Sequence, residues 1–363
     1  MGMIEILREL VAIDSTSAVS NLPVIEALDR RARALGFATR RQEWTDAAGV
    51  RKANLIARRG PDRPGGLALV GHSDCVPFDP SWSGALRPEE KEGKLFGRGS
   101  ADNKAFLAAA LSASARARHP GTLHLVFTAD EEVGCLGARR LAEDAAFRPA
   151  RAIVGEPTRL IPVLGHKGYC LAEIAVHGAE GHSAYPETGA SAILAAGRLL
   201  REIETIAAER DEAFSPPFTT TNVGIIQGGK AKNVIPGLCT LTLEWRPLPR
   251  EDVRRVLGLV EAACARVAGG KIRIEVKPQR LDAGVLVPAE SELVRFLERQ
   301  SGRAPETIPF GTELPYLAAL GTEACVFGPG DIREAHRSGE FVPLAEAERA
   351  VEILAQAIER FAV

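Results

Sequence analysis

Residues 67 to 78 read "LALVGHSDCVPF", an apolar run that ends at Gly71 and is followed directly by His72, Ser73 and Asp74. A short apolar run that ends in polar residues is typical of a buried strand that brings functional groups to the edge of a sheet. Two interpretations fit these polar residues: a serine nucleophile beside its own base, or a metal ligand beside the carboxylate that orients it. This stretch alone leaves both interpretations open.

Similar apolar runs alternate with helical patterns along much of the chain. After "LALV" come the Ala-rich helix "KAFLAAALSASARA", the run "LHLVF", a helix expected from Leu136 to Glu143, and the run "RAIVG". The run "ACVFG" and the helical pattern "LAEAERAVEILAQAIERF" follow towards the C-terminus. This alternation predicts an α/β fold in which helices pack on a mainly parallel sheet.

Residues 165 to 277 have a different order of elements. Strand and helix patterns follow one another there as β-α-β-β-α-β, from "YCLAEIAVHG" to "KIRIEV", which is the ferredoxin-like arrangement. We therefore predict one domain formed by residues 1–164 and 278–363, with residues 165–277 inserted as a smaller α+β satellite domain.

The composition is that of an ordinary globular protein. The 363 residues are 45% hydrophobic and 25% charged, and the formal net charge of -2 lacks the basic surplus that nucleic acid or an anionic membrane would require. We find no 18-residue apolar span, and the six cysteines form no C-x-x-C pair that would indicate a thiolate zinc site. We expect a cytoplasmic protein with a small-molecule partner and free, buried thiols.

Acidic residues and histidines follow the apolar runs at the points where each run ends. They are His72 and Asp74 after "LALV", Asp130, Glu131 and Glu132 after "LHLVF", Glu156 after "RAIVG", and Asp331 and His336 after "ACVFG", with Asp102 in "GRGSADNK" as a further contributor. Since functional groups collect beyond the carboxyl ends of strands in open α/β sheets, these side chains could converge. Adjacent buried carboxylates repel one another unless cations neutralise them, which favours metal.

Two histidines and three carboxylates, without sulfur, suit a pair of divalent ions such as zinc, cobalt or manganese. A shared carboxylate can bridge two such ions, and water held between them becomes a nucleophile near neutral pH. The serine alternative lacks its motif, because "GHSDC" and "GHSAY" do not have the last glycine of G-x-S-x-G. No phosphate-binding G-x-x-x-x-G-K-[ST] loop occurs either.

Together these residues resemble the dinuclear metal-dependent aminoacylase and carboxypeptidase family. The matching stretches span nearly the whole chain in order: "GHSDCVPF", "LFGRGSADNK", "FTADEEVGCLGAR", "GEPT" followed by "HKG", "GHSAYPETGASAI", "KNVIPG", "EWRPLP", "GTELPY" and "FGPGDIREAH". The resemblance implies a catalytic domain of the zinc-peptidase type and hydrolysis of a linear amide in a small N-acyl amino acid or dipeptide. A catalytically silent binding module of the same fold is the alternative, although such a module is expected to lack a ligand or base.

The resemblance also implies roles for the acidic and histidine residues. The implied metal ligands are His72 and Glu156 for one ion, Glu132 and His336 for the other, and Asp102 between them, with zinc as the expected metal. Asp74 would orient His72, Glu131 would be the general base, and the peptide from Asp102 to Asn103 would be cis. The segment after His336, "RSGEF", departs from the Pro-Asp-Glu that usually follows this histidine by one residue.

Further roles fall on the satellite domain and on "GTELPY". The resemblance implies that His182 stabilises the oxyanion in the site of a neighbouring subunit, so we expect a homodimer formed through the satellite domain. Asn233 and Arg246 resemble contacts to a substrate carboxylate, although an arginine between a strand and a proline can equally be structural. We also expect Gly311, Thr312 and Glu313 to contact substrate, with Glu313 suited to an ammonium group.

Overall fold

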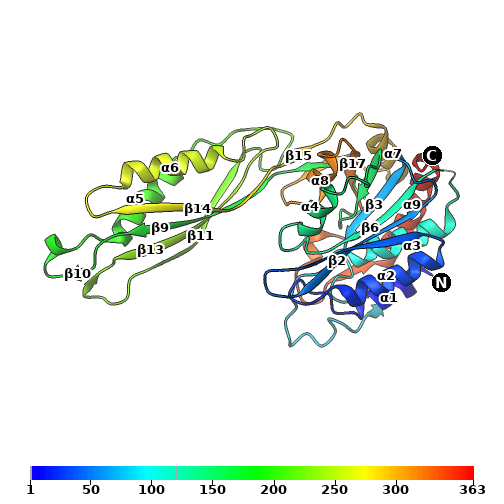
Figure 1. Cartoon of the computed structure of the whole chain (residues 1–363), viewed down its shortest axis with the longest axis horizontal. Helices are drawn as coiled ribbons and strands as arrows, with labels where there is room; N and C mark the ends of the chain where they lie inside the picture. Colours follow the sequence, from blue (N-terminus) through cyan, green and yellow to red (C-terminus); the bar gives the residue numbers. More distant parts are fainter. Residues whose placement is uncertain (1, 120) are drawn as a thin grey trace. The chain divides into compact units, whose positions relative to one another are not determined.

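The structure is a computed structural model that describes residues 2–119 and 121–363. It divides into two compact units (Figure 1). Unit 1 comprises Met1–Gly165, Val287–Glu306 and Thr312–Val363, and unit 2 comprises His166–Leu286 and Thr307–Gly311. Each unit has its own hydrophobic core, so each is described by itself.

The central sheet of unit 1 follows the order β1-β2-β6-β3-β7-β17-β8. The strands are β1 (Ala38–Thr45), β2 (Arg51–Arg59), β3 (Leu67–His72), β6 (Leu123–Thr128), β7 (Arg151–Val154), β8 (Val163–His166) and β17 (Glu323–Val326). The central pairs β6-β3, β3-β7 and β7-β17 are parallel, and the flanking pairs are antiparallel. The prediction of a mainly parallel sheet with helices is therefore confirmed.

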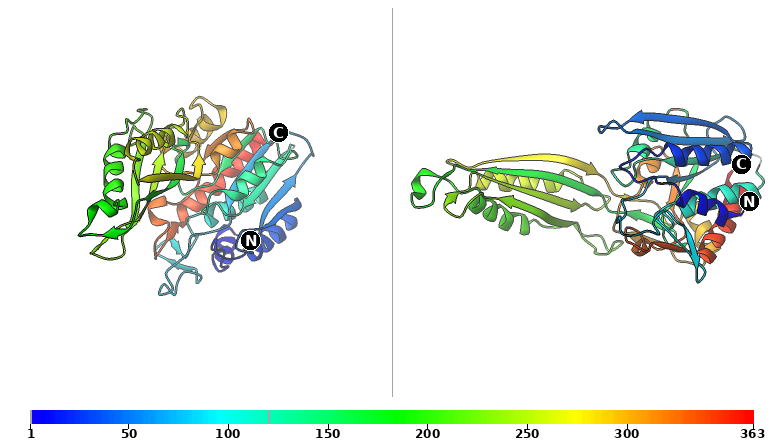
Figure 2. Two further views of the ribbon diagram at one scale, coloured as in Figure 1. Left: turned by 60° about the vertical axis from the view of Figure 1, so that its left-hand side comes forward. Right: turned by 90° about the horizontal axis from the view of Figure 1, so that it is seen from below.

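Strands β3 and β6 are buried at every residue, as expected for central strands that helices cover on both faces. The helices of unit 1 are α1 (Met3–Val11), α2 (Leu22–Ala34), α3 (Lys104–Arg116), α4 (Leu136–Ala142), α7 (Glu292–Ser301), α8 (Leu314–Ala318) and α9 (Leu344–Phe361). The Ala-rich α3 contacts α1, α9 and β3 (Figure 2). Small alanine side chains allow these close contacts, which fix the start of α3 beside the end of β3.

Unit 1 also has a small antiparallel sheet, in the order β18-β5-β4, that joins two distant segments. Its strands are β4 (Glu89–Lys91), β5 (Lys94–Phe96) and β18 (Phe341–Pro343). Phe341 pairs with Phe96, so the segment that follows His336 lies beside the segment that precedes Asp102. A short 3-10 helix, η2 (Ile332–Glu334), leads into His336.

Unit 2 has the predicted ferredoxin-like arrangement, with the sheet order β11-β13-β9-β14 and antiparallel neighbours throughout. Its main elements are β9 (Tyr169–His177), α5 (Ala192–Glu204), β11 (Thr220–Gly228), β13 (Leu238–Arg246), α6 (Arg255–Val267) and β14 (Arg273–Asp282). Alternate residues of β9 and β13 are buried, because the contacting helices α5 and α6 cover one face of the sheet (Figure 2).

Shorter elements complete the two units. They are β10 (Gly181–His182), which pairs with β12 (Val234–Ile235), the 3-10 helix η1 (Pro186–Thr188), and the strands β15 (Val285–Leu286) and β16 (Glu306–Ile308). The boundary expected at residue 277 falls inside β14. That strand continues to Asp282 because a register shift between Pro278 and Arg280 accommodates the proline on an edge strand.

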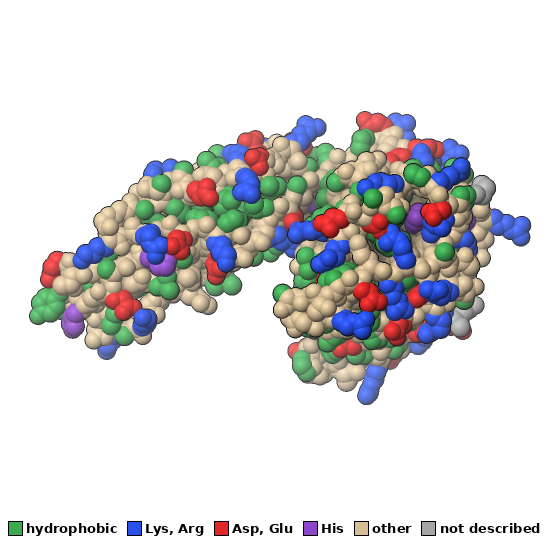
Figure 3. Space-filling model, viewed as in Figure 1, with side chains coloured by type: hydrophobic (Ala, Val, Ile, Leu, Met, Phe, Trp, Pro, Cys, Tyr) green, Lys and Arg blue, Asp and Glu red, His purple; other side chains and the backbone are tan. Residues whose placement is uncertain are grey.

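The surface and the cysteines agree with the composition. All six cysteines are buried and free. Positive and negative side chains are interspersed on the face drawn in Figure 3. Across residues 2–119 and 121–363, we find no helix with the length and apolar character needed to span a bilayer.

Candidate metal centre

Three parallel strands bring their acidic and histidine residues to one edge of the unit 1 sheet. His72 ends β3, Glu131 and Glu132 follow β6, and Glu156 follows β7. Because β3 pairs in parallel with both β6 and β7, the carboxyl ends of all three strands lie at the same edge. Asp102 joins them from the loop just before α3, whose N-cap is Asn103.

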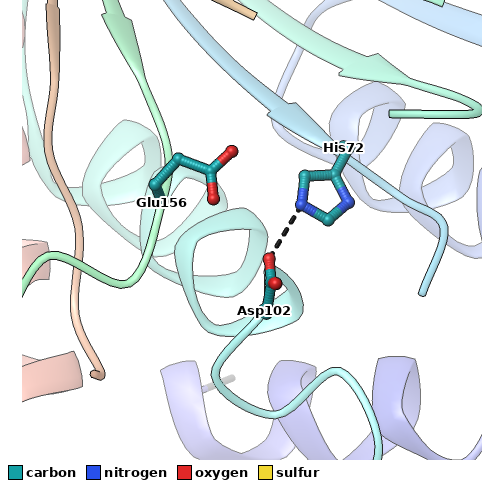
Figure 4. A group of neighbouring side chains, drawn as sticks. All are labelled: His72, Asp102 and Glu156. Atoms are coloured by element: carbon teal, nitrogen blue, oxygen red, sulfur yellow. Dashed lines mark hydrogen bonds and ion pairs between the residues drawn. The ribbon is translucent and has the colours of Figure 1, made fainter. Parts of the chain in front are cut away.

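His72, Asp102 and Glu156 form the first cluster, in which one ligand atom of each residue lies within 4.8 Å of the others. All three residues are buried. The His72 Nε2 and Asp102 Oδ1 atoms are 2.9 Å apart, and the Glu156 carboxylate reaches towards both side chains (Figure 4). This arrangement offers one nitrogen and two carboxylate groups to a single cation.

Asp102, Glu132 and His336 form the second cluster, again within 4.8 Å. His336 Nε2 lies 3.1 Å from Asp102 Oδ2 and 3.2 Å from Glu132 Oε1. Asp102 therefore belongs to both clusters and directs one carboxylate oxygen to each histidine. The peptide between Asp102 and Asn103 is cis, as the resemblance implied. A shared carboxylate between two ligand sets is the expected geometry for a pair of divalent ions.

The carboxylates of this edge are strongly perturbed. Burial raises the pKa of Glu156 well above its ordinary value, and the negative charge of Asp102 raises it further. Burial and the charge of Asp102 also raise the pKa of Glu132. Burial raises the pKa of Asp102 as well, but hydrogen bonds from His336 and His72 outweigh that effect and lower it overall. Several buried acids with so little compensating positive charge fit a site that binds two divalent cations.

The histidines respond to the same negative surroundings. Burial lowers the pKa of His72, yet its hydrogen bond to Asp102 and the nearby carboxylates raise the pKa well above the ordinary value. Hydrogen bonds to Asp102 and Glu132 raise the pKa of the half-exposed His336 to about 10. Cations bound at this edge would replace these protons, because metal ligation requires neutral imidazole.

Asp74 forms a hydrogen bond with His72 through its backbone carbonyl, and its carboxylate lies farther from the ring. His72 Nδ1 lies 3.0 Å from the Asp74 carbonyl oxygen, whereas the nearest carboxylate oxygen, Oδ1, is 3.8 Å away. The carboxylate instead accepts hydrogen bonds from the backbone N–H groups of Glu131 (3.1 Å) and Glu132 (3.3 Å) and from Ser17 Oγ (2.8 Å). The hydrogen bond to His72 is thus made by the Asp74 carbonyl, and the Asp74 carboxylate, 3.8 Å from the ring, also holds the loop after β6.

Glu131 lies in this loop without belonging to either cluster. Burial raises its pKa to about 8 against the opposing effect of His72, and the charges of Glu132, Glu313 and Asp102 raise it further. The Cys135 thiol donates a hydrogen bond to Glu131 Oε1 at 3.3 Å. Cys135 lies four residues after Glu131, at the start of α4. A carboxyl group with a pKa near neutrality is suited to accept and release a proton.

The residue before Glu131 holds the turn in place. Asp130 has a left-handed backbone with φ of 57°, which is uncommon for a residue other than glycine. Its carboxylate pairs at 2.9 Å with Lys52 Nζ, and both side chains are buried. Lys52 also donates to the carbonyl oxygens of Ser17 and Val19. Asp130 is therefore a structural anchor and not a member of the ligand clusters.

Glu313 is a buried acid close to the centre. Its Oε1 atom has no hydrogen-bond partner within the part of the chain that the structure describes. Burial raises the pKa of Glu313 to about 7, although the nearby Thr128 hydroxyl and the charge of His72 oppose this shift. The neighbouring Thr312 is also buried and accepts from the Leu314 N–H group, while Gly311 belongs to unit 2.

The other expected site residues lie on unit 2. His182 is exposed on β10, where its ring packs against Tyr185. Asn233 is also exposed. It lies beside His182, because its carbonyl oxygen accepts a hydrogen bond from the Ser183 N–H group. Arg246 ends β13 and pairs with Glu244 at 2.9 Å. Their contribution to the centre on unit 1 stays a prediction.

Comparison with known proteins identifies the family of this chain. Residues 68–360 match the model of the peptidase family M20/M25/M40. The chain is 52% identical to an acetylornithine deacetylase of Myxococcus xanthus, over 98% of this chain and 96% of that protein. It is 36% identical to an acetylornithine deacetylase of Proteus mirabilis (strain HI4320), over 99% and 96% respectively.

A solved structure supports the fold. The crystal structure of a tripeptidase from Staphylococcus aureus superposes with a TM-score of 0.81 at 22% sequence identity, and the match covers 99% of this chain and 97% of the tripeptidase. Likeness at that identity concerns the fold, whereas the family match and the two deacetylases extend along nearly the whole sequence. The chain described here belongs to the peptidase family M20/M25/M40.

Proposed function

We propose that this protein is a metal-dependent amide hydrolase that converts N-acetyl-L-ornithine and water into L-ornithine and acetate, a step of arginine biosynthesis. The observation that carries the proposal is a pair of ligand clusters sharing Asp102, next to a protonatable Glu131, in a chain 52% identical to an acetylornithine deacetylase. The similarity of "GTELPY" and "FGPGDIREAH" to that kind of enzyme adds support.

The proposed ligands are His72 and Glu156 for one ion and Glu132 and His336 for the other, with Asp102 between the two. Nitrogen and carboxylate ligands without sulfur fit zinc, and cobalt or manganese would accept the same set. When bound, the two cations would polarise the acyl carbonyl and lower the pKa of a water molecule at the centre. Metal content measured on the purified protein tests the choice of ion.

Glu131 is the proposed general base. It would take a proton from the attacking water as the new bond from oxygen to the acyl carbon forms, and would pass that proton to the departing amine as the C–N bond breaks. Asp74 supports this role because its carboxylate holds the backbone of Glu131 and Glu132. His182 is proposed to donate a hydrogen bond to the oxyanion that develops on the acyl carbonyl.

The substrate contacts are proposed on chemical grounds. Asn233 and Arg246 offer amide and guanidinium donors suited to the carboxylate of an N-acyl amino acid. Glu313, with Gly311 and Thr312 before it, offers a carboxylate suited to the side-chain ammonium of ornithine. The unsatisfied Glu313 Oε1 atom supports this assignment, because a buried acceptor without a donor is costly.

We also propose a homodimer formed through unit 2. Strand β11 is an edge strand of its sheet, and Ile225 and Ile226 on it are 53% and 51% exposed. Leu194, near the start of α5, is 67% exposed. An unpaired edge that carries exposed apolar side chains favours pairing with the same edge of a second copy.

The substrate assignment is tested with a panel of N-acyl amino acids assayed with zinc and with cobalt. N-acetyl-L-ornithine is expected to give the highest kcat/KM, because the chain is 52% identical to an acetylornithine deacetylase and the ornithine ammonium can pair with Glu313. N-acetyl-lysine, N-acetyl-citrulline, succinyl-diaminopimelate and a small dipeptide are the comparison substrates. A clear preference for any of these would reject the assignment while leaving amide hydrolysis intact.

Replacing Glu131 by glutamine should separate catalysis from metal binding. We expect Glu131→Gln to lower kcat by at least about 10²-fold, since general base catalysis contributes roughly 10²–10⁴-fold. Binding of two ions, measured by metal analysis, should persist because Glu131 lies outside both clusters. Glu132→Gln is the matched control and should lose affinity for one ion; a Glu131→Gln variant with a near-normal rate contradicts the role.

The stability of the metal-free protein should fall as the pH rises. Glu131 and Glu313 have folded pKa values of about 8 and about 7, above the ordinary 4.5. At a pH between 4.5 and each raised pKa, the folded state therefore binds more protons than the unfolded state. His336, at about 10 against 6.5, acts in the same direction up to higher pH. Stability present at low pH is therefore lost on raising the pH through this window.

Thermal unfolding of the metal-free chain between about pH 5 and about pH 9 measures this effect. We expect the midpoint to decrease steadily, and zinc to raise it most at the high end, where cations no longer compete with protons. Glu313→Gln should remove part of the decrease near neutral pH. A midpoint that stays level or increases with pH in the metal-free protein is the contrary result.

Sedimentation velocity tests the proposed dimer. The wild-type chain should sediment as a dimer at micromolar concentration, and Ile226→Lys should shift it to a monomer because it places a charge on the paired edge. Leu259→Lys is the matched control, since Leu259 is an exposed apolar residue on α6, away from that edge. A monomeric wild type, or dissociation by both substitutions, opposes the dimer proposal.

A further inference from the structure

We propose that Glu340, held by Arg98, is a positioning residue that fixes the shared carboxylate Asp102 and thereby sets the affinity of both metal positions together. The inference rests on the proposed two-metal function and adds to it two residues outside the ligand clusters. Glu340 belongs to "RSGEF", the segment that departs from the family pattern after His336.

The Glu340 carboxylate contacts the backbone at Asp102. Its Oε1 atom accepts hydrogen bonds from the N–H groups of Ala101 (3.0 Å) and Asp102 (3.1 Å). These two N–H groups immediately precede the cis peptide that leads into α3. A charged acceptor that binds two consecutive N–H groups fixes the local backbone, and so fixes the point from which the Asp102 side chain starts.

Arg98 compensates the buried charge of Glu340. Its Nη1 atom lies 2.6 Å from Glu340 Oε2, and the residues are 3% and 0% exposed. Arg98 is itself held, because its Nη2 atom donates to the Pro77 carbonyl and its guanidinium lies over the Trp82 ring. A buried ion pair costs less when further hydrogen bonds satisfy its partners. Glu340 accepts two from backbone N–H groups and Arg98 donates one to the Pro77 carbonyl, whereas Arg98 Nε has no partner within the described residues.

The Glu340–Arg98 pair would act on both ions through Asp102, because both clusters share this carboxylate. Asp102 directs Oδ1 to His72 and Oδ2 to His336, so a shift of its backbone changes both clusters at once. Glu340 is also tied to β5, because its carbonyl oxygen accepts from the Gly97 N–H group and the next residue, Phe341, pairs with Phe96. The Glu340 side chain thus starts from a fixed backbone.

A competing explanation is that Glu340 only closes the loop that carries His336. The two explanations differ in which metal position they affect. A loop function would weaken the ion held by Glu132 and His336 alone, whereas a clamp on Asp102 weakens both ions. Stepwise titration with cobalt distinguishes them, with Glu156→Gln and Glu132→Gln as references for loss at one position each.

The test compares Glu340→Gln and Glu340→Asp with the wild type. Glutamine keeps the shape but removes the charge that pairs with Arg98, and aspartate keeps the charge but is too short to reach both N–H groups. Affinity for Co²⁺ is measured on the metal-free protein by competition with a chromophoric chelator, well below the unfolding temperature. Glu352→Gln, which removes an exposed ion pair with Arg349 on α9, is the matched control.

We expect a loss of roughly 10–100-fold in affinity at both positions for each Glu340 variant, the usual effect of removing a residue that orients a metal ligand, and no change for Glu352→Gln. A folded Glu340 variant that binds both ions as tightly as the wild type, or that weakens only the Glu132–His336 position, overturns the inference and leaves the proposed function standing. A wild type that binds no pair of ions overturns both.

Discussion

Crowding of buried and partly buried carboxylates at one edge of a parallel sheet is the constraint on which the rest of this structure depends. Asp102, Glu131, Glu132 and Glu156 lie together there, and only the histidines His72 and His336 contribute compensating charge within the clusters. Such a group is unfavourable in the folded state unless protons or cations neutralise it. The folded state therefore favours the binding of protons or cations at this edge of the sheet.

Around this edge the chain uses charged residues as supports. Lys52 neutralises Asp130 beneath the turn that carries Glu131, and Arg98 neutralises Glu340 beside Asp102. In both pairs one member also binds backbone groups, so charge compensation and backbone positioning are achieved by the same side chains. Within residues 2–119 and 121–363, the proposed ligands Asp102, Glu132 and Glu156 form no ion pair with lysine or arginine, so their negative charge remains available to cations.

Local patterns in the sequence were enough to predict the sheet, the ferredoxin-like unit and the convergence of His72, Glu156 and Glu132, because strand ends in parallel sheets share an edge. Contacts between side chains and distant backbone groups could not be predicted from local patterns. The Asp74 carboxylate binds N–H groups 57 and 58 residues away, and Glu340 binds N–H groups 239 and 238 residues away. No local pattern in the sequence indicates contacts between residues so far apart along the chain. The end of β14 could not be predicted either. Pro278 suggests that the strand ends there, but a register shift after Pro278 allows this edge strand to continue.

The order in which the ligands occur along the chain has a consequence for biosynthesis. His72, Asp102, Glu132 and Glu156 precede unit 2, whereas His336 follows it and meets Asp102 across 234 residues of sequence. A polypeptide emerging from the ribosome therefore presents the residues of the first cluster long before His336 and Glu340 are translated. Because Glu340 contacts the backbone at Asp102, which both clusters share, both would reach their full affinity for cations only after the last portion of the chain has been made.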